Sequence, residues 1–296
     1  MRPLENHLKA DLLLLLVTLL AAAGWIFSKE ALAEMPPLLF VGTRFLMAGV
    51  FLGLAGWQPL KALTAQHLRQ ALGLGILFAI AMGFWIMGLR YGAHVGEGAF
   101  ITSLGIVLVP VIARLVFKDR PPRSIWLALP VAVLGFGCLS LNHGFQAEPG
   151  QLYYLISAVF FAVLFNINSR VVSRVPAIAL TSVQLIVVGL VSLLVSSLIE
   201  IWPAGVSQAT LGWLAASAVL ATSMRFFIQV FAQGLTSPSH AAVIMMLEPI
   251  WTALLAAGWF GERMSGVQFL GCTLIFVALL INRWEWVRKL LKSAWH

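Results

Sequence analysis

Three charged side chains lie deep inside apolar stretches of this sequence, where they can bind or transfer charge. Glu248 stands in the run "AAVIMMLEPIWTALLAAGWF", and Arg44 and Arg225 stand in the middle of two other apolar runs. A buried carboxylate can bind a cationic group or carry a proton, because burial favours its neutral form. A guanidinium group can hold a carboxylate or a phosphate through paired hydrogen bonds. We therefore predict that Arg44, Arg225 and Glu248 contact a small polar substrate.

Each of these residues also has a structural interpretation, which the sequence leaves open. Glu248 would accept hydrogen bonds around a helix kink, and Arg44 would pair with Glu248 or with a helix carbonyl group. Arg225 would pack on the two rings that follow it, Phe226 and Phe227, and pair with an acid. If all three residues face one cavity, two arginines and one glutamate leave an excess positive charge. An anionic or zwitterionic cargo would neutralise it.

Two prolines near these positions are predicted to let helices flex. Pro249 follows Glu248 directly and has no backbone N–H, so we expect the helix to loosen near Met245, one turn earlier. Pro110 stands in the corresponding apolar run of the first half. We predict that Glu248, Pro249 and Pro110 take part in coupling or gating. Glu248 would carry protons or, alternatively, bind the ammonium group of the cargo.

Aromatic and small polar residues in the same apolar runs are candidates for the wall of a binding cavity. Rings in membrane helices usually serve packing or lipid contact. A wall of rings with a few hydroxyl and amide groups nevertheless suits an amphipathic metabolite. The predicted substrate-binding residues of this kind are Trp25, Phe84, Trp85, Phe100, Ser103, Phe165 and Asn166.

The composition indicates which elements must position these residues. Apolar residues make up 60% of the chain and charged residues only 10%, as in proteins embedded in a membrane. Runs long enough to cross a hydrocarbon core of roughly 30 Å recur along the chain, without the strict alternation of a β-barrel. They span residues 10–31, 37–56, 70–89, 96–117, 125–141, 151–169, 177–198, 211–233, 240–259 and 265–282. We predict an all-α membrane protein with ten transmembrane helices.

Basic residues predict how these helices are oriented. Of the 19 Lys and Arg residues, 14 lie at helix ends on the side of the N-terminus and 3 at the opposite ends, with Arg44 and Arg225 inside the membrane. Because Lys and Arg are retained on the cytoplasmic side, we predict that both termini face the cytoplasm of a bacterial-type inner membrane. The same placement explains the net charge of +8 without nucleic-acid binding. Residues 283–296 mix Trp with Lys and Arg, which predicts a cytoplasmic amphipathic tail at the membrane interface.

The two halves of the chain repeat one another with offsets of 140 residues in the earlier part and 143 in the later part. The aligned pairs are Pro36 with Pro176, Arg44 with Gln184, Gly49 with Gly189, Leu104 with Leu247, and Asp119-Arg120 with Glu262-Arg263. A unit of five helices that occurs twice must enter the membrane in opposite orientations. We therefore predict two inverted five-helix repeats, residues 1–148 and 149–282. Transporters built this way hold the substrate near the bilayer midplane, at the repeat interface.

These features resemble the drug/metabolite transporter superfamily in its EamA-type branch of ten helices. The resemblance is carried by the helix count, the two halves, the tryptophan in "AAGWIFSKEAL", the Arg44-Phe45 pair and the motif "LEPIWTALLAAGWFGER". The first half departs from this motif, with Gly105 opposite Glu248 and Pro110 one turn later than expected. The resemblance implies export of amino acids, other small metabolites or drugs; some relatives carry nucleotide sugars or sugar phosphates.

Together, these patterns predict an inner-membrane secondary transporter that exports an amino acid or an amino-acid-like metabolite by alternating access. Alternatives are an exporter of drugs or of another anionic metabolite, a channel, and an intramembrane lipid-modifying enzyme. The enzyme interpretation lacks a zinc-binding HExxH, a paired acidic motif and a nucleophile with a positioned base. The expected partners are a small molecule and the lipid bilayer, with proton coupling and facilitated exchange both open. No cofactor, metal site or obligate protein partner is predicted; Cys138 and Cys272 lie inside predicted spans.

Overall fold

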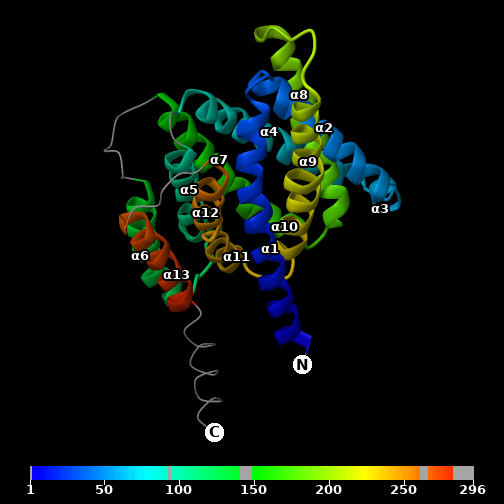
Figure 1. The fold of residues 1–296 in the computed structure, drawn as a ribbon. Helices are drawn as coiled ribbons and strands as arrows, with labels where there is room; N and C mark the ends of the chain where they lie inside the picture. Colours follow the sequence, from blue (N-terminus) through cyan, green and yellow to red (C-terminus); the bar gives the residue numbers. More distant parts are fainter. Residues whose placement is uncertain (1, 93–94, 141–148, 261–265, 283–296) are drawn as a thin grey trace.

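The computed structural model describes residues 2–92, 95–140, 149–260 and 266–282, and the regular elements of this part are all helices (Figure 1). The first half comprises α1 (Arg2–Ala31), α2 (Pro37–Ala55), α3 (Trp57–Lys61), α4 (Ala65–Tyr91), α5 (Val95–Leu115) and α6 (Arg123–Ser140). The second half comprises α7 (Pro149–Val171), α8 (Ala177–Ile199), α9 (Gln208–Ala218), a π-helix (Val219–Met224), α10 (Arg225–Gln233), α11 (Pro238–Met245), α12 (Glu248–Phe260) and α13 (Gly266–Asn282). The prediction of an all-α membrane protein is confirmed.

Seven helical stretches of the described chain are long and apolar enough to cross a membrane, judged by length and composition. They are Leu8–Ala31, Pro37–Ala55, Ala65–Tyr91, Pro149–Val171, Ala177–Ile199, Gln208–Gln233 and Pro238–Phe260. The remaining predicted spans contain three shorter apolar helices, Ile101–Leu115, Arg123–Gly135 and Phe269–Ala278. Each predicted span therefore coincides with an apolar helical stretch.

Helices α2 and α8 run antiparallel in close contact, and their contacts follow the offset of the two halves. The close approaches along the pair are Gly42 to Leu193, Gly49 to Ile186, Gly53 to Ser182 and Gly56 to Ile178. An ideal Cβ atom at Gly49 would lie 2.6 Å from the backbone N of Ile186, and one at Gly189 would lie 2.5 Å from the backbone N of Leu46. With the 140-residue offset, Gly49 corresponds to Gly189 and Leu46 corresponds to Ile186. The contact of Gly49 with Ile186 is therefore equivalent to that of Gly189 with Leu46. A pseudo-two-fold axis thus passes between these equivalent helices, as an inverted repeat requires.

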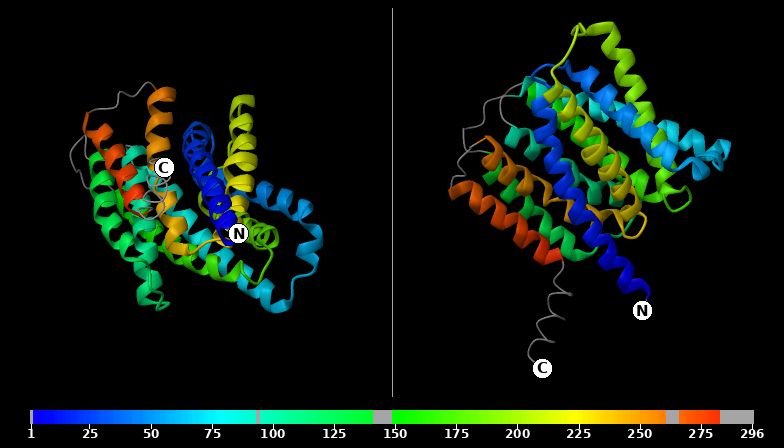
Figure 2. Two further views of the ribbon diagram at one scale, coloured as in Figure 1. Left: turned by 90° about the horizontal axis from the view of Figure 1, so that it is seen from below. Right: turned by 45° about the vertical axis from the view of Figure 1, so that its right-hand side comes forward.

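The first helix of each half packs against the other half. α1 contacts α9, α10, α11 and α12, whereas α7 contacts α4 and α5. α6 and α13 pair along one edge of the molecule, in green and red in Figure 2. α1 begins and α13 ends on the same side of the molecule (Figure 1), which we call the N-terminal face, and the other side is the opposite face. Because α1 and α7 each pack against helices of the opposite half, a central space lies between the two halves.

Two spans of the second half are interrupted, whereas the corresponding helices of the first half are continuous. The eighth span passes from α9 to α10 through the π-helix, and the ninth is divided between α11 and α12. In the first half, α4 and α5 run through without a break, and Pro110 lies inside α5. Arg225 and Glu248 are the first residues after the two interruptions. The predicted loosening near Met245 coincides with the end of α11.

Two carboxylates join the halves at the opposite face. Glu200 accepts hydrogen bonds from the backbone N–H groups of Leu38 and Leu39, at 2.9 Å each, at the beginning of α2. Glu34 accepts one from the backbone N–H of Ser207, at 2.7 Å, just before α9. This backbone hydrogen bond holds the pKa of the exposed Glu34 carboxyl below its usual value. These contacts fix the beginning of α2 and the beginning of α9, each against the other half.

Candidate functional site

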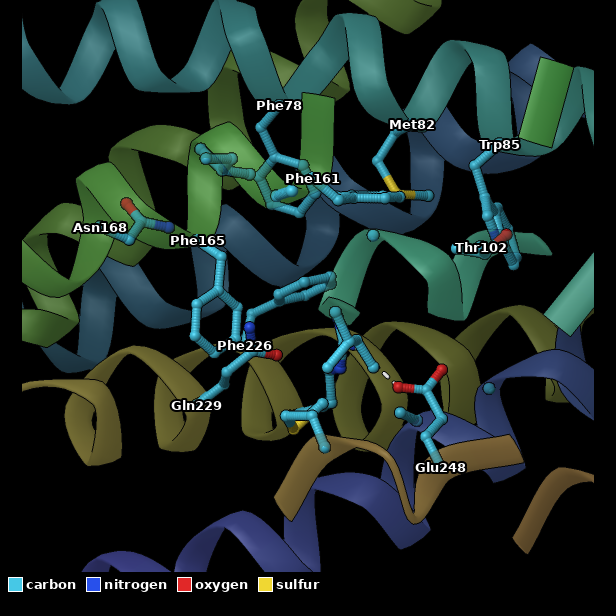
Figure 3. A pocket seen from close by; sticks show the side chains of 18 of the residues that line it. Phe78, Met82, Trp85, Thr102, Phe161, Phe165, Asn168, Phe226, Gln229 and Glu248 are labelled. Atoms are coloured by element: carbon cyan, nitrogen blue, oxygen red, sulfur yellow. Dashed lines mark ion pairs between the residues drawn. The ribbon is translucent and has the colours of Figure 1, made fainter. Parts of the chain in front are cut away.

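The space between the halves is a cavity of about 1080 Å³, including the part that is open to solvent. Helices from both halves line it, among them α1, α2, α4, α5, α7, α8 and α10. Arg44, Arg225 and Glu248 all contribute to its wall. Figure 3 shows rings around the middle of the cavity, with Glu248 toward one end. The three charged residues singled out in the sequence therefore share one cavity.

Glu248 binds one partner from each half. The indole Nε1 of Trp25 donates to Glu248 Oε1 at 3.1 Å, and Arg225 Nη2 lies 3.6 Å from Glu248 Oε2. Figure 3 marks this ion pair with a dashed line. Glu248 is the first residue of α12, where the backbone N–H groups and the helix dipole favour a negative charge. The Glu248 side chain is 19% exposed and forms part of the cavity wall.

The break before Glu248 has a local cause. Pro249 has no N–H to donate to the carbonyl four residues earlier, that of Met245. Just before it, Met246 N donates to Val243 O at 3.2 Å and Leu247 N donates to Ile244 O at 3.1 Å, both over three residues. The last turn of α11 is thus tightened, and α12 begins anew at Glu248.

Arg225 follows the π-helix, and its guanidinium group lies over the ring of Phe226, with Cζ 4.1 Å from the ring centroid. The prediction of an arginine stacked on a ring and paired with an acid matches this geometry. Arg225 Nε is buried and has no hydrogen-bond partner among the described residues. A buried donor without a partner is costly, so Nε has a hydrogen bond left to donate.

Arg44 is held by neutral groups. Its Nε donates to Thr222 Oγ1, its Nη1 to Ser28 Oγ at 2.9 Å, and its Nη2 to the carbonyl of Ala221 at 3.3 Å. Of the two structural partners considered for it, a helix carbonyl is the one present. Gln184, which aligns with Arg44, donates to Asn168 Oδ1 at 2.7 Å, and Asn168 aligns with Ser28. The same bond between the first and second helices therefore occurs in both halves.

The chain matches the EamA-like transporter family over residues 8–141 and 148–284. It belongs to this family. It is similar to an "Uncharacterized transporter" of Archaeoglobus fulgidus (29% identity, 93% of this chain and 86% of the relative). It is also similar to a "Probable amino-acid metabolite efflux pump" of Salmonella typhimurium (25% identity, 93% and 94%). A solved structure titled "Crystal structure of protein" shares the fold with a TM-score of 0.76 at 19% identity, covering 92% of this chain and 95% of that one.

Family membership makes this protein a membrane transporter, and the enzyme alternative is set aside. The resemblance to the drug/metabolite transporter superfamily is confirmed, and the two matched segments correspond to two copies of the family unit. The cavity of this EamA-like transporter thus lies between the two copies. The charged residues of its wall come from α2 of the first copy and from α10 and α12 of the second.

Four other predicted residues line the cavity of the transporter: Trp25, Trp85, Ser103 and Phe165. The rings of Trp25 and Trp85 meet edge to face, with centroids 4.8 Å apart. The prediction for Phe100 falls on a side chain outside the described part of the structure. Pro110 and Pro249 are not in the cavity wall, although Pro249 adjoins Glu248.

The structure places Phe84 and Asn166 away from the cavity wall. Phe84 stacks on Phe160, with ring centroids 6.2 Å apart, where α4 meets α7. Asn166 Nδ2 donates to the carbonyls of Val109 and Ala162, at 3.0 Å each, and thereby joins α7 to α5. In this structure these two residues therefore connect helices and do not belong to the cavity wall.

Several residues of the cavity wall were not predicted from the sequence. The rings of Phe78, Phe161 and Phe226 form a cluster, with centroid distances of 6.1 Å and 4.8 Å from Phe78 to the other two (Figure 3). Thr102 Oγ1 and Gln229 Oε1 are buried without partners among the described residues. Gln184 could have been predicted, because it aligns with Arg44 in the repeat. In contrast, nothing in the sequence distinguishes Phe78 from a ring that faces lipid.

Proposed function

We propose that this protein is a secondary transporter that exports an amino acid or an amino-acid-like metabolite across a bacterial-type inner membrane by alternating access. The observation that carries the proposal is the shared cavity of Arg44, Arg225 and Glu248. Among the charged residues in its wall, two are positive and one is negative. A cargo with a carboxylate would balance this excess, and Arg225 Nε offers it a donor.

The remaining features of the cavity fit such a cargo. The carboxylate of Glu248 would carry a proton or, alternatively, receive an ammonium group, and the cluster of Phe78, Phe161 and Phe226 would cover an apolar side chain. The name of the Salmonella typhimurium relative supports amino-acid metabolites as cargo and export as direction. Both termini would face the cytoplasm, because basic residues accumulate at the N-terminal face.

The test is a comparison of acids with their amides on the purified protein. Ligands that bind the folded state raise apparent stability in proportion to their affinity and concentration. The proteinogenic L-amino acids are compared with their carboxamides by the shift in melting temperature in detergent. We expect a subset of the acids to stabilise the protein and the matching amides to do so at least about tenfold more weakly, a loss that corresponds to one hydrogen-bonded charge contact.

Two arginine variants locate the effect. Arg225→Gln should remove the preference for the acid, because it removes the positive charge at the cavity wall. Arg123→Gln is the matched control, since Arg123 is exposed at the beginning of α6, outside the cavity. Equal stabilisation by acid and amide would refute a carboxylate-bearing cargo and favour the export of drugs by the same cavity.

A further inference from the structure

At the N-terminal face, α5 and α7 are joined by an ion pair that is not part of the cavity. Arg170 Nη2 lies 2.5 Å from Asp119 Oδ2, and Arg170 Cζ lies 3.7 Å from the centroid of the Phe117 ring. Asp119 is fixed by the turn after α5, where its N–H donates to the carbonyl of Ala113 at 2.9 Å. Arg170 Nη1 donates to the carbonyl of Asn166 at 2.6 Å. Both partners of the ion pair are thus held by their own backbone surroundings.

The equivalent contact occurs at the opposite face, between the ends of α1 and α12. Lys29 Nζ lies 4.6 Å from the centroid of the Phe260 ring, and Trp259 Nε1 donates to Glu30 Oε1 at 3.0 Å. Phe260 aligns with Phe117 through the offset of 143 residues. Each half therefore places a cation from the end of its first helix, α1 or α7, over a phenylalanine ring of the other half. That ring lies at the end of the fourth span, α12 or α5.

The contact of Arg170 with Asp119 and the contact of Lys29 and Glu30 with α12 differ in the described residues. At the N-terminal face, Arg170 is 30% exposed, and Asn166 joins α7 to α5 one turn below it. At the opposite face, Trp259 is 57% exposed, and no ion pair joins α1 to α12 within the described ranges. An apolar groove of about 630 Å³ also lies there between α1, α9 and α12, lined by residues such as Phe27, Trp213 and Trp259. Within the described residues, the contact at the N-terminal face is thus the one that contains an ion pair, between Arg170 and the 42% exposed Asp119.

We propose that Phe117, Asp119 and Arg170 form the gate of the N-terminal face and that Lys29, Glu30, Trp259 and Phe260 form the gate of the opposite face. The resting carrier is closed at the first gate and opens more readily at the second. The proposal rests on the alternating-access part of the proposed function. In such carriers two related packings exchange, so a contact present in only one of them sets the balance between the two states.

The gates are tested by the accessibility of the cavity to a membrane-impermeant thiol reagent. The carrier has Cys138→Ala and Cys272→Ala, with a reporter Thr102→Cys in the cavity wall. Vesicles of both orientations present either face to the reagent. We expect the reporter to react faster from the opposite face. Asp119→Asn should raise its reaction rate from the N-terminal face about two- to fivefold, the effect of losing a partly exposed ion pair.

Two further variants make the test specific. The charge exchange Asp119→Arg with Arg170→Asp restores an ion pair in the reverse sense and should return the rate toward that of the parent. The pair Glu30→Gln with Trp259→Phe is the matched control in the other gate, and it should raise the rate from the opposite face only. Each variant is first shown to be monodisperse with the melting temperature of the parent in detergent.

An unchanged rate from the N-terminal face in folded Asp119→Asn would overturn the proposal. If Asp119→Asn does not fold, the charge-exchanged protein tests the gate instead. A parental melting temperature together with a raised labelling rate from the N-terminal face would mean that the ion pair supports folding only, and it would overturn the gate. Labelling requires no cargo, so the result is independent of the proposed substrate. Equal binding of acids and amides alongside the expected labelling would refute the cargo and leave the gates in place.

Discussion

At the scale of single residues, the two buried arginines have different surroundings and therefore different roles. Arg44 donates to Ser28, Thr222 and the Ala221 carbonyl, and so connects three helical segments. Arg225 forms an ion pair with Glu248, and its Nε has no hydrogen-bond partner in the described part of the chain. Arg44 thus holds its positive charge in a fixed position, whereas in the proposed function Arg225 would bind the carboxylate of the cargo.

Glu248→Gln separates proton coupling from binding. The variant keeps the volume and the acceptor for Trp25 Nε1 but cannot titrate. We expect it to exchange cargo across proteoliposomes at a rate similar to the parent and to lose accumulation driven by a pH gradient, because no proton is released or taken up. The cargo is an amino acid identified by thermal stabilisation. Accumulation equal to that of the parent would exclude Glu248 from coupling, and a lower affinity for the ammonium-bearing acid would assign it to binding.

The sequence predicts these charged positions well and the neutral ones poorly, for a physical reason. A charge in an apolar run needs a polar environment, so Arg44, Arg225 and Glu248 had to face a cavity or one another. A ring or an amide can face lipid, a neighbouring helix or the cavity. Phe84 and Asn166 could not be distinguished from Phe78 and Asn168, because a membrane helix is apolar on all sides and gives no periodic signal.

At the scale of helices, the second half carries both interruptions that border the charged pair. In the π-helix, the hydroxyls of Thr222 and Ser223 donate to the carbonyls of Ser217 and Ala218, five residues earlier, at 2.8 Å and 2.9 Å. π-helical turns are rare and often occur at functional sites. Arg44 from the other half donates to Thr222 and to the Ala221 carbonyl of this turn, a contact that could not be predicted from the local sequence. Pro249, in contrast, acts on its own helix, so its effect near Met245 was predictable.

Pro249→Ala tests whether the break in the ninth span is needed for transport. Alanine restores the N–H that can donate to the Met245 carbonyl, so α11 and α12 can join into one helix. We expect slower exchange and slower gradient-driven export, with unchanged cargo affinity, because the helix must flex between two states. Pro130→Ala is the matched control, since α6 is already continuous through Pro130 and Pro130 is not in the cavity wall. An equal loss in both variants, or none in Pro249→Ala, would contradict a flexing role for the break.

At the scale of the whole molecule, the two halves share an axis and differ in their charge. The antiparallel α2 and α8 approach too closely for side chains at four glycines, so they form a rigid centre. The cavity, its charged pair and the two end contacts lie around this centre. In the proposed alternating access, the two halves would exchange roles by a small rotation, in which the interrupted helices of the second half would bend.

The glycines of the axis give the last prediction. A methyl group at Gly189 would lie 2.5 Å from the backbone N of Leu46, and backbone atoms in packed helices cannot move away cheaply. We expect Gly189→Ala and its equivalent Gly49→Ala each to lower the free energy of unfolding by about 1–3 kcal/mol, the usual cost of overpacking. Gly73→Ala is the control, because nothing lies within 4 Å of its added Cβ atom and alanine favours the helix. It should leave the melting temperature in detergent unchanged or slightly raised. A parental melting temperature for both Gly189→Ala and Gly49→Ala would mean that α2 and α8 separate readily, and the rotation would then require a different centre.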